Sequence, residues 1–215
     1  MSEALQTVSH DRLTRMLQAD WSGHTRLESA CRMWFVWERG YLLLDDTVIA
    51  KPSATAMEGL AWVFSSTERR PVYGLSLVLL VWTDGHQRIP LSLRLWHKGG
   101  PSTYELALAL LSYARHRLRG HPEYVLFDAW YPSKALLQRI WDYGWYFICR
   151  LKKKRRFNGQ PLRAYRRPPY GAEPGRLSGG LKVLVVRDGA KDLGHQSAHA
   201  AGGRGPPTGS PPLPD

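Results

Sequence analysis

The chain has 215 residues, and its 30 Lys and Arg against 18 Asp and Glu give a formal net charge of +12. The length predicts one domain or slightly more, and the positive charge favours a polyanionic partner, either nucleic acid or an anionic membrane surface. Two cysteines are too few for a disulfide scaffold, no apolar run approaches the roughly 20 residues of a membrane span, and the N-terminus shows no signal-peptide pattern. Secreted, membrane-spanning and disulfide-stapled classes are therefore excluded, and a cytoplasmic protein is expected.

The chain divides into three predicted parts. Residues 1–39 show two short helical patterns, which fit either a helix-turn-helix reader of DNA or a helical cap on the main domain. Residues 40–187 alternate strands and helices, and we predict one core domain there. Residues 188–215 are mostly Gly, Pro, Ala, Ser and His, so we predict a disordered tail that cannot bury enough surface to fold.

The core domain is predicted to contain six strands and two helices. Apolar runs predict the strands at 41–44, 73–83, 88–96, 124–127, 145–151 and 181–186. Asp84-Gly85 predicts a hairpin turn, and Pro90 places the strand that follows it at a sheet edge. Ser102 or Thr103 is the expected N-cap of a helix to about residue 119, and Ser133 that of a helix ended by Gly144.

Two of these strands carry carboxylates directly after them. Residues 41–44 and 124–127 are apolar throughout, as central parallel strands are, and Asp46 and Asp128 follow them. Ligands bind at the carboxyl ends of strands in open α/β sheets, so the two acids converge if the strands are parallel neighbours. Adjacent carboxylates favour a cation between them, and Mg²⁺ suits one or two carboxylates plus phosphate oxygens. Taken singly, either acid is more simply explained as a turn residue.

A run of positive charge supports a phosphate-containing partner. It extends from the predicted strand beside the one that carries Asp128, and it comprises Arg150, Lys152, Lys153, Lys154, Arg155 and Arg156. Such a run binds nucleic acid by neutralising phosphates, although charge runs are also common on faces that only contact solvent. A membrane surface is a weaker interpretation, because no amphipathic basic helix accompanies the run.

The segments YLLLDDTVIAKP (41–52) and YVLFDAWYPSKALLQRIWDYGWYFICRLKKKRRFNG (124–159) resemble DDE transposases of bacterial insertion sequences, in the insertion-sequence-four superfamily. The resemblance covers roughly residues 1–187. It implies an RNase H-like α/β fold, with three antiparallel strands followed by parallel strands and crossover helices. It also implies DNA cleavage and strand transfer at transposon ends with Mg²⁺ or Mn²⁺. The metal-binding catalytic acids would be Asp46, with Asp45 as the fallback, and Asp128.

The third acid of that family does not have a counterpart in this sequence. The family places a catalytic Glu in a Tyr-x2-Arg-x3-Glu setting, and after Leu177 the acids are Asp188, Asp192 and Asp215. The resemblance therefore implies a truncated or frameshifted, catalytically inactive transposase, located with DNA in the nucleoid and lacking a small-molecule substrate.

Two alternatives to the inactive transposase remain open. One is a non-catalytic DNA-binding remnant that inhibits full-length transposase, which would then be a second partner. The other is an RNase H-like nuclease that uses Glu105 or Glu123 as its third acid.

Overall fold

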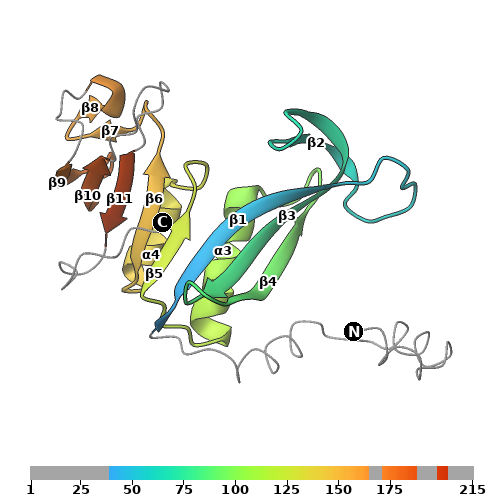
Figure 1. Ribbon diagram of the computed structural model, residues 1–215, viewed down its shortest axis with the longest axis horizontal. Helices are drawn as coiled ribbons and strands as arrows, with labels where there is room; N and C mark the ends of the chain where they lie inside the picture. The colour runs from blue at the N-terminus through green and yellow to red at the C-terminus, as the bar shows by residue number, and fades with distance from the viewer. Residues whose placement is uncertain (1–38, 165–170, 188–197, 203–215) are drawn as a thin grey trace.

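The computed structural model describes residues 39–164, 171–187 and 198–202, and these residues are built around one mixed sheet (Figure 1). The sheet order is β2-β3-β1-β5-β6-β11-β10-β9, and β4 pairs with β3 outside this path. Its strands are β1 (Tyr41–Ala50), β2 (Ala61–Ser65), β3 (Arg70–Thr83), β4 (Arg88–Trp96), β5 (Tyr124–Phe127), β6 (Tyr146–Leu151), β9 (Gly171–Arg176), β10 (Lys182–Arg187) and β11 (Ala198–Gly202).

The first half of the sheet is antiparallel. β3 pairs with β1 on one side and with β4 on the other, and Asp84-Gly85 lies in the β3–β4 turn as predicted. β4 is an edge strand that carries Pro90, and the register shifts next to Pro90 because Leu91 is an extra residue opposite β3. The predictions of a hairpin and of an edge position for Pro90 are therefore confirmed.

The second half of the sheet begins with three parallel strands. β5 pairs parallel with both β1 and β6, in a register that aligns Leu44, Phe127 and Cys149. The predicted mixed sheet, with three antiparallel strands followed by parallel ones, is thus confirmed. Parallel pairing also brings the carboxyl ends of β1, β5 and β6 to the same end of the sheet.

Two helices cover one side of the sheet (Figure 1). α3 (Thr103–Ser112) begins with a capping box between Ser102 and Glu105, and it continues as the π-helical segment η2 (Tyr113–Arg117). α4 (Lys134–Asp142) has Ser133 as its N-cap and ends before Gly144, whose φ of +75° suits glycine. Both predicted caps are confirmed. Buried leucines of the two helices pack onto the sheet and complete the core.

The structure differs from the predicted strands at β1 and β2. β1 does not end at Leu44, as predicted, but runs on to Ala50, because the 14-residue strand β3 provides backbone partners up to Gly74. β2 is an additional strand, paired with the first residues of β3. Its residues 61–64 form an apolar run that could have predicted a strand, and Trp62 and Phe64 are strongly exposed on it.

Further strand pairings were not predicted, among them that of β9 with β10. β7 (Arg156–Phe157) and β8 (Gln160–Pro161) form a short hairpin after β6, and η3 (Leu162–Ala164) follows. β11 lies within the predicted disordered tail and pairs with β6 and β10, so that prediction is wrong for residues 198–202. Strand pairing uses backbone N–H and C=O groups, and it does not require the large apolar side chains whose absence suggested disorder.

Several predictions fall outside the described residues. They are the predictions of a helical region before residue 39 and of disorder at residues 188–197 and 203–215. Within the described residues, no helix is both long and apolar enough to cross a membrane.

Candidate active site at the carboxyl ends of the parallel strands

The structure brings Asp46 and Asp128 to the same end of the sheet. The parallel pairing of β1 with β5 stops at Leu44 and Phe127, so Asp46 and Asp128 each lie just beyond the last residue of their own strand that takes part in this pairing. The two carboxylates are close enough that the negative charge of Asp128 raises the pKa of Asp46. The predicted convergence is therefore present, although Asp46 lies within β1 and not after it.

Asp46 is held from the loop that carries Asp128. Strand alternation puts Asp46 on the same face of β1 as the buried Leu42 and Leu44. Tyr131, a fully buried residue of the β5–α4 connection, donates a hydrogen bond from its hydroxyl to Oδ1 of Asp46 at 3.1 Å. One carboxylate oxygen of Asp46 is therefore fixed, and the other is left without this restraint.

The pKa of Asp46 lies above its usual range. Loss of hydration around the carboxylate is the main cause, and the charges of Asp45 and Asp128 add to it, while the Tyr131 hydrogen bond acts in the opposite direction. The pKa of the Tyr131 hydroxyl is raised as well, by burial and then by the nearby acids. Where negative charge is already disfavoured, a bound cation stabilises the ionised carboxylates most.

Asp128 begins a tight turn and is exposed to solvent. Its Oδ1 accepts a hydrogen bond from the backbone N–H of Trp130 at 2.7 Å. Trp130 is in turn held by α3, because the Tyr104 hydroxyl donates to the Trp130 carbonyl at 3.0 Å. Asp128 thus resembles a turn aspartate with one oxygen engaged, and its second oxygen is not used by this turn.

The other candidate acids have different positions. Asp45 lies on the opposite face of β1 by strand alternation, and its Oδ1 accepts the backbone N–H of Asp46 at 2.9 Å. Glu123 precedes β5 and donates its backbone N–H to Gly40, so it lies at the opposite end of β5 from Asp128. Glu105 accepts hydrogen bonds from the backbone N–H and the hydroxyl of Ser102, which lower its pKa and engage it in capping α3.

Two acids, and not three, are therefore gathered at this site. Among residues 39–164, 171–187 and 198–202, no cluster of three or more His, Cys, Asp and Glu side chains could hold a metal ion. The donor set of Asp46 and Asp128 still fits Mg²⁺, which commonly uses one or two protein carboxylates and takes its other ligands from phosphate and water.

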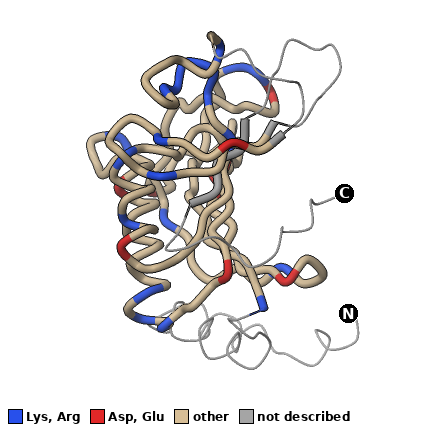
Figure 2. The backbone as a smooth tube through the Cα atoms, turned by 90° about the vertical axis from the view of Figure 1, so that its left-hand side faces the viewer, with Lys and Arg blue, Asp and Glu red and all other residues tan. Residues whose placement is uncertain are grey.

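The basic run lies beside the acids. It begins with Arg150 near the end of β6 and continues through the turn that joins β6 to β7. Its members Arg150, Lys152, Lys153, Lys154 and Arg156 are exposed, whereas Arg155 is half-buried with its Nε enclosed by protein. Figure 2 shows Lys and Arg segments gathered toward the upper end of the molecule, where Figure 1 places β7 and β8.

A direct contact joins the part of the basic run in the β6–β7 turn, called the basic turn below, to the loop that carries Asp128. The Lys152 ammonium lies 4.3 Å from the centroid of the Trp130 ring, and Trp130 is two residues from Asp128. A cation at this distance from an indole face is attracted to it. Positive charge is therefore placed beside the loop that carries Asp128.

Sequence reasoning missed the roles of Tyr131 and Trp130. Both follow Asp128 closely in the segment DAWY, and a buried tyrosine hydroxyl generally has a partner. That rule suggests a hydrogen bond for Tyr131, but the sequence does not show that Asp46, 85 positions away, accepts it.

Comparison with known families identifies the domain. Residues 37–195 match the transposase DDE domain family, which is well over half of the chain. The chain belongs to this family. No curated protein matches it.

Comparison with solved structures supports the fold. The chain is similar to a piggyBac transposase in a synaptic complex with hairpin DNA, with 14% identity and a TM-score of 0.51. The match covers 75% of this chain and 32% of that one, so the DDE-domain chain spans about a third of the piggyBac chain. The likeness shows that the mixed sheet is the RNase H-like transposase fold.

Two nuclease structures give weaker matches. One is the catalytic domain of human Endonuclease V, with 11% identity and a TM-score of 0.36 over 85% of this chain and 81% of that one. The other is the NurA nuclease from Sulfolobus solfataricus, with 10% identity and a TM-score of 0.32 over 94% of this chain and 80% of that one.

Proposed function

We propose that this DDE domain binds transposon-end DNA and holds a divalent cation between Asp46 and Asp128. The observation that supports this most is the arrangement at the carboxyl ends of β1 and β5. Two acids from neighbouring parallel strands share one electrostatic environment, and Tyr131 orients one of them. The basic turn beside them supplies charge for the DNA backbone.

The proposed cation would be Mg²⁺ or Mn²⁺, with Asp46 and Asp128 as its protein ligands. When bound, such an ion stabilises the attacking and leaving oxygens of a phosphoryl transfer. The residues of this chain would contribute orientation and charge: Tyr131 restrains one oxygen of Asp46, and the Trp130 backbone restrains one oxygen of Asp128. Lysines of the β6–β7 turn would bind phosphates of the DNA strand that lies at the acids.

We further propose that this chain does not carry out strand transfer by itself. A third acid does not join Asp46 and Asp128 among the described residues, and no Tyr-x2-Arg-x3-Glu segment occurs in the 215 residues. Phosphoryl transfer depends on positioned charge around the phosphate, so a missing metal ligand removes a large part of catalysis. The proposal fits a member of the insertion-sequence-four superfamily whose third acid is not among these residues.

The experiment is a nicking and strand-transfer assay on transposon-end DNA with Mg²⁺ or Mn²⁺, combined with a binding assay on the same DNA. We expect salt-dependent binding without cleavage. Metal-dependent cleavage that Asp128→Ala abolishes would contradict the proposed inactivity, and absence of DNA binding would contradict the proposed partner.

A further inference from the structure

Trp130 is an exposed aromatic residue fixed between the two acids and the basic turn. Its residue surface is 51% exposed, although it is one of the largest apolar side chains in the described part of the chain. Its backbone is held at both polar groups, by Asp128 Oδ1 at 2.7 Å and by the Tyr104 hydroxyl at 3.0 Å. The indole is therefore presented to solvent by a loop that is already restrained.

Lys152 gives this aromatic surface a positive charge. Its Nζ lies 4.3 Å from the centroid of the Trp130 ring, yet about half of Trp130 stays exposed. A contact that served only to cover the indole would leave less of it in water. An indole beside a cation matches two parts of a nucleotide at once, because the base has a π-face and the phosphate is negative.

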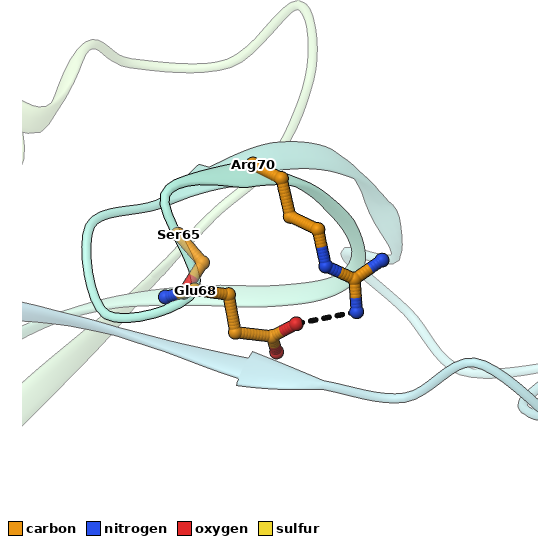
Figure 3. A network of polar contacts seen from close by, with 3 residues as sticks. All are labelled: Ser65, Glu68 and Arg70. Carbon is orange, nitrogen blue, oxygen red and sulfur yellow. Dashed lines mark hydrogen bonds and ion pairs between the residues drawn. The ribbon is translucent and has the colours of Figure 1, made fainter.

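Another exposed aromatic pair in the structure lacks these surroundings. Trp62 and Phe64 on β2 are 72% and 66% exposed, and the ring of Trp62 lies against Tyr73 at 5.7 Å. At the start of β3, next to them, Arg70 is bound by the carboxylate of Glu68, so its charge is compensated (Figure 3). Exposure of a tryptophan alone is thus not what distinguishes Trp130.

We propose that Trp130 stacks on a base of an unpaired DNA strand while Lys152 binds a neighbouring phosphate. This inference rests on the proposed function, because it takes DNA as the partner. It assigns the position of the strand: the stacked base lies next to Asp128, so the phosphate beside that base is the one nearest to the acid pair. Trp130 is then a nucleic-acid contact, and its indole ring is the group that acts.

The test measures the affinity of the full chain for three labelled probes by fluorescence anisotropy. The probes are a single-stranded oligonucleotide of mixed sequence, the same strand with abasic sites at its centre, and the corresponding duplex. The variants are Trp130→Ala, Trp130→Phe and Lys152→Ala, with Trp62→Ala as the matched control for loss of an exposed indole.

For the intact single strand, we expect Trp130→Ala to weaken binding about 5- to 150-fold, the range for loss of one base–aromatic stack. Trp130→Phe keeps an aromatic face and retains most of the affinity, and Trp62→Ala leaves it unchanged. On the abasic strand the difference between Trp130→Ala and the parent disappears. Lys152→Ala instead lowers the log–log salt dependence by about 0.7 for one contact with a single strand.

Three results would overturn this proposal alone. In the first, Trp130→Ala binds the intact strand as well as Trp62→Ala does. In the second, it loses as much affinity on the abasic strand as on the intact one. In the third, the parent protein binds duplex DNA with the expected salt dependence but does not bind the single strand, which contradicts stacking and leaves the proposed DNA partner standing. A parent that binds none of the probes would contradict both proposals.

Discussion

Asp84 lies just beyond the last paired residue of β3, whereas Asp46 lies within the β1–β3 pair, and their carboxylates have opposite environments. Asp84 in the β3–β4 turn accepts the backbone N–H groups of Gln87 and His86 at 2.7 and 2.9 Å, which lower its pKa. Asp46 accepts one hydroxyl hydrogen bond from Tyr131 and lies near two other acids, and its pKa is raised. The local chain satisfies the first carboxylate, whereas the second is the one at which we propose a cation.

This contrast separates a turn aspartate from a site aspartate better than sequence position does. Both residues follow apolar segments, and both look like turn residues when taken alone. At Asp84 two backbone donors lower the pKa, whereas at Asp46 loss of hydration raises it first and the nearby acids add to this. The predictions below test that difference, from the largest expected effect to the smallest.

The largest effect is expected on metal binding. Asp46→Asn and Asp128→Asn each remove a charged ligand, so Mn²⁺ affinity measured by calorimetry should fall by more than about 100-fold, beyond the usual effect of residues that only support a ligand. Asp84→Asn removes the same charge from the turn and should leave Mn²⁺ affinity unchanged. Equal affinities in all three variants would mean that Mn²⁺ binds elsewhere.

A smaller loss is expected from Tyr131→Phe. This variant keeps the buried ring and removes the hydroxyl that restrains Asp46, so Mn²⁺ affinity should fall by about 10- to 100-fold, as for other groups that orient metal ligands. Tyr143→Phe is the matched control, because it also removes a tyrosine hydroxyl, one that accepts a hydrogen bond from Arg139 at the end of α4. An affinity equal to that of the control would show that the Tyr131 hydroxyl does not position Asp46.

The basic turn should determine the salt dependence of DNA binding. Replacing Lys152, Lys153 and Lys154 by Ala should reduce the log–log slope on duplex DNA by about 0.9 for each lysine that contacts a phosphate. The control variant replaces the exposed Lys51, Lys98 and Lys182, which removes the same net charge elsewhere. If both triple variants show the same slope, the run is only a solvated face.

The smallest effects are on stability, and they have opposite signs. Because folding raises the pKa of Asp46, its ionisation above the ordinary value of 3.8 destabilises the fold. Without metal, Asp46→Asn should therefore raise Tm at neutral pH, and the gain should vanish as pH falls below that value. Folding lowers the pKa of Asp84, so Asp84→Asn should lower Tm at neutral pH, and that loss should fade as pH falls through the lowered pKa. Thermal unfolding of both variants in chelator at several pH values measures this, and shifts of the same sign would contradict the contrast.

The sequence was sufficient for the central strands because their apolar runs are unambiguous. Residues 41–44 and 124–127 are apolar on both faces, which indicated parallel neighbours and hence the meeting of Asp46 and Asp128. The Ser102–Glu105 capping box and the Asp84-Gly85 turn were equally readable, because each depends on residues a few positions apart.

Some of the features that were not predicted have a local signal in the sequence, and others do not. Asn158-Gly159 is a hairpin signal in the sequence and could have located β7 and β8; both residues have positive φ, of +48° and +81°. In contrast, the extension of β1 depends on the length of β3, and β11 depends on a backbone edge offered by β6 and β10. The link from Tyr131 to Asp46 is likewise a tertiary contact.

The central claim is that the carboxylates of Asp46 and Asp128 together bind one divalent cation. The most direct test is anomalous diffraction from crystals of the full chain soaked in Mn²⁺. The account predicts an anomalous peak ligated by a carboxylate oxygen of Asp46 and one of Asp128. A peak held by Asp128 without Asp46, or Mn²⁺ peaks only at other acids, would contradict it.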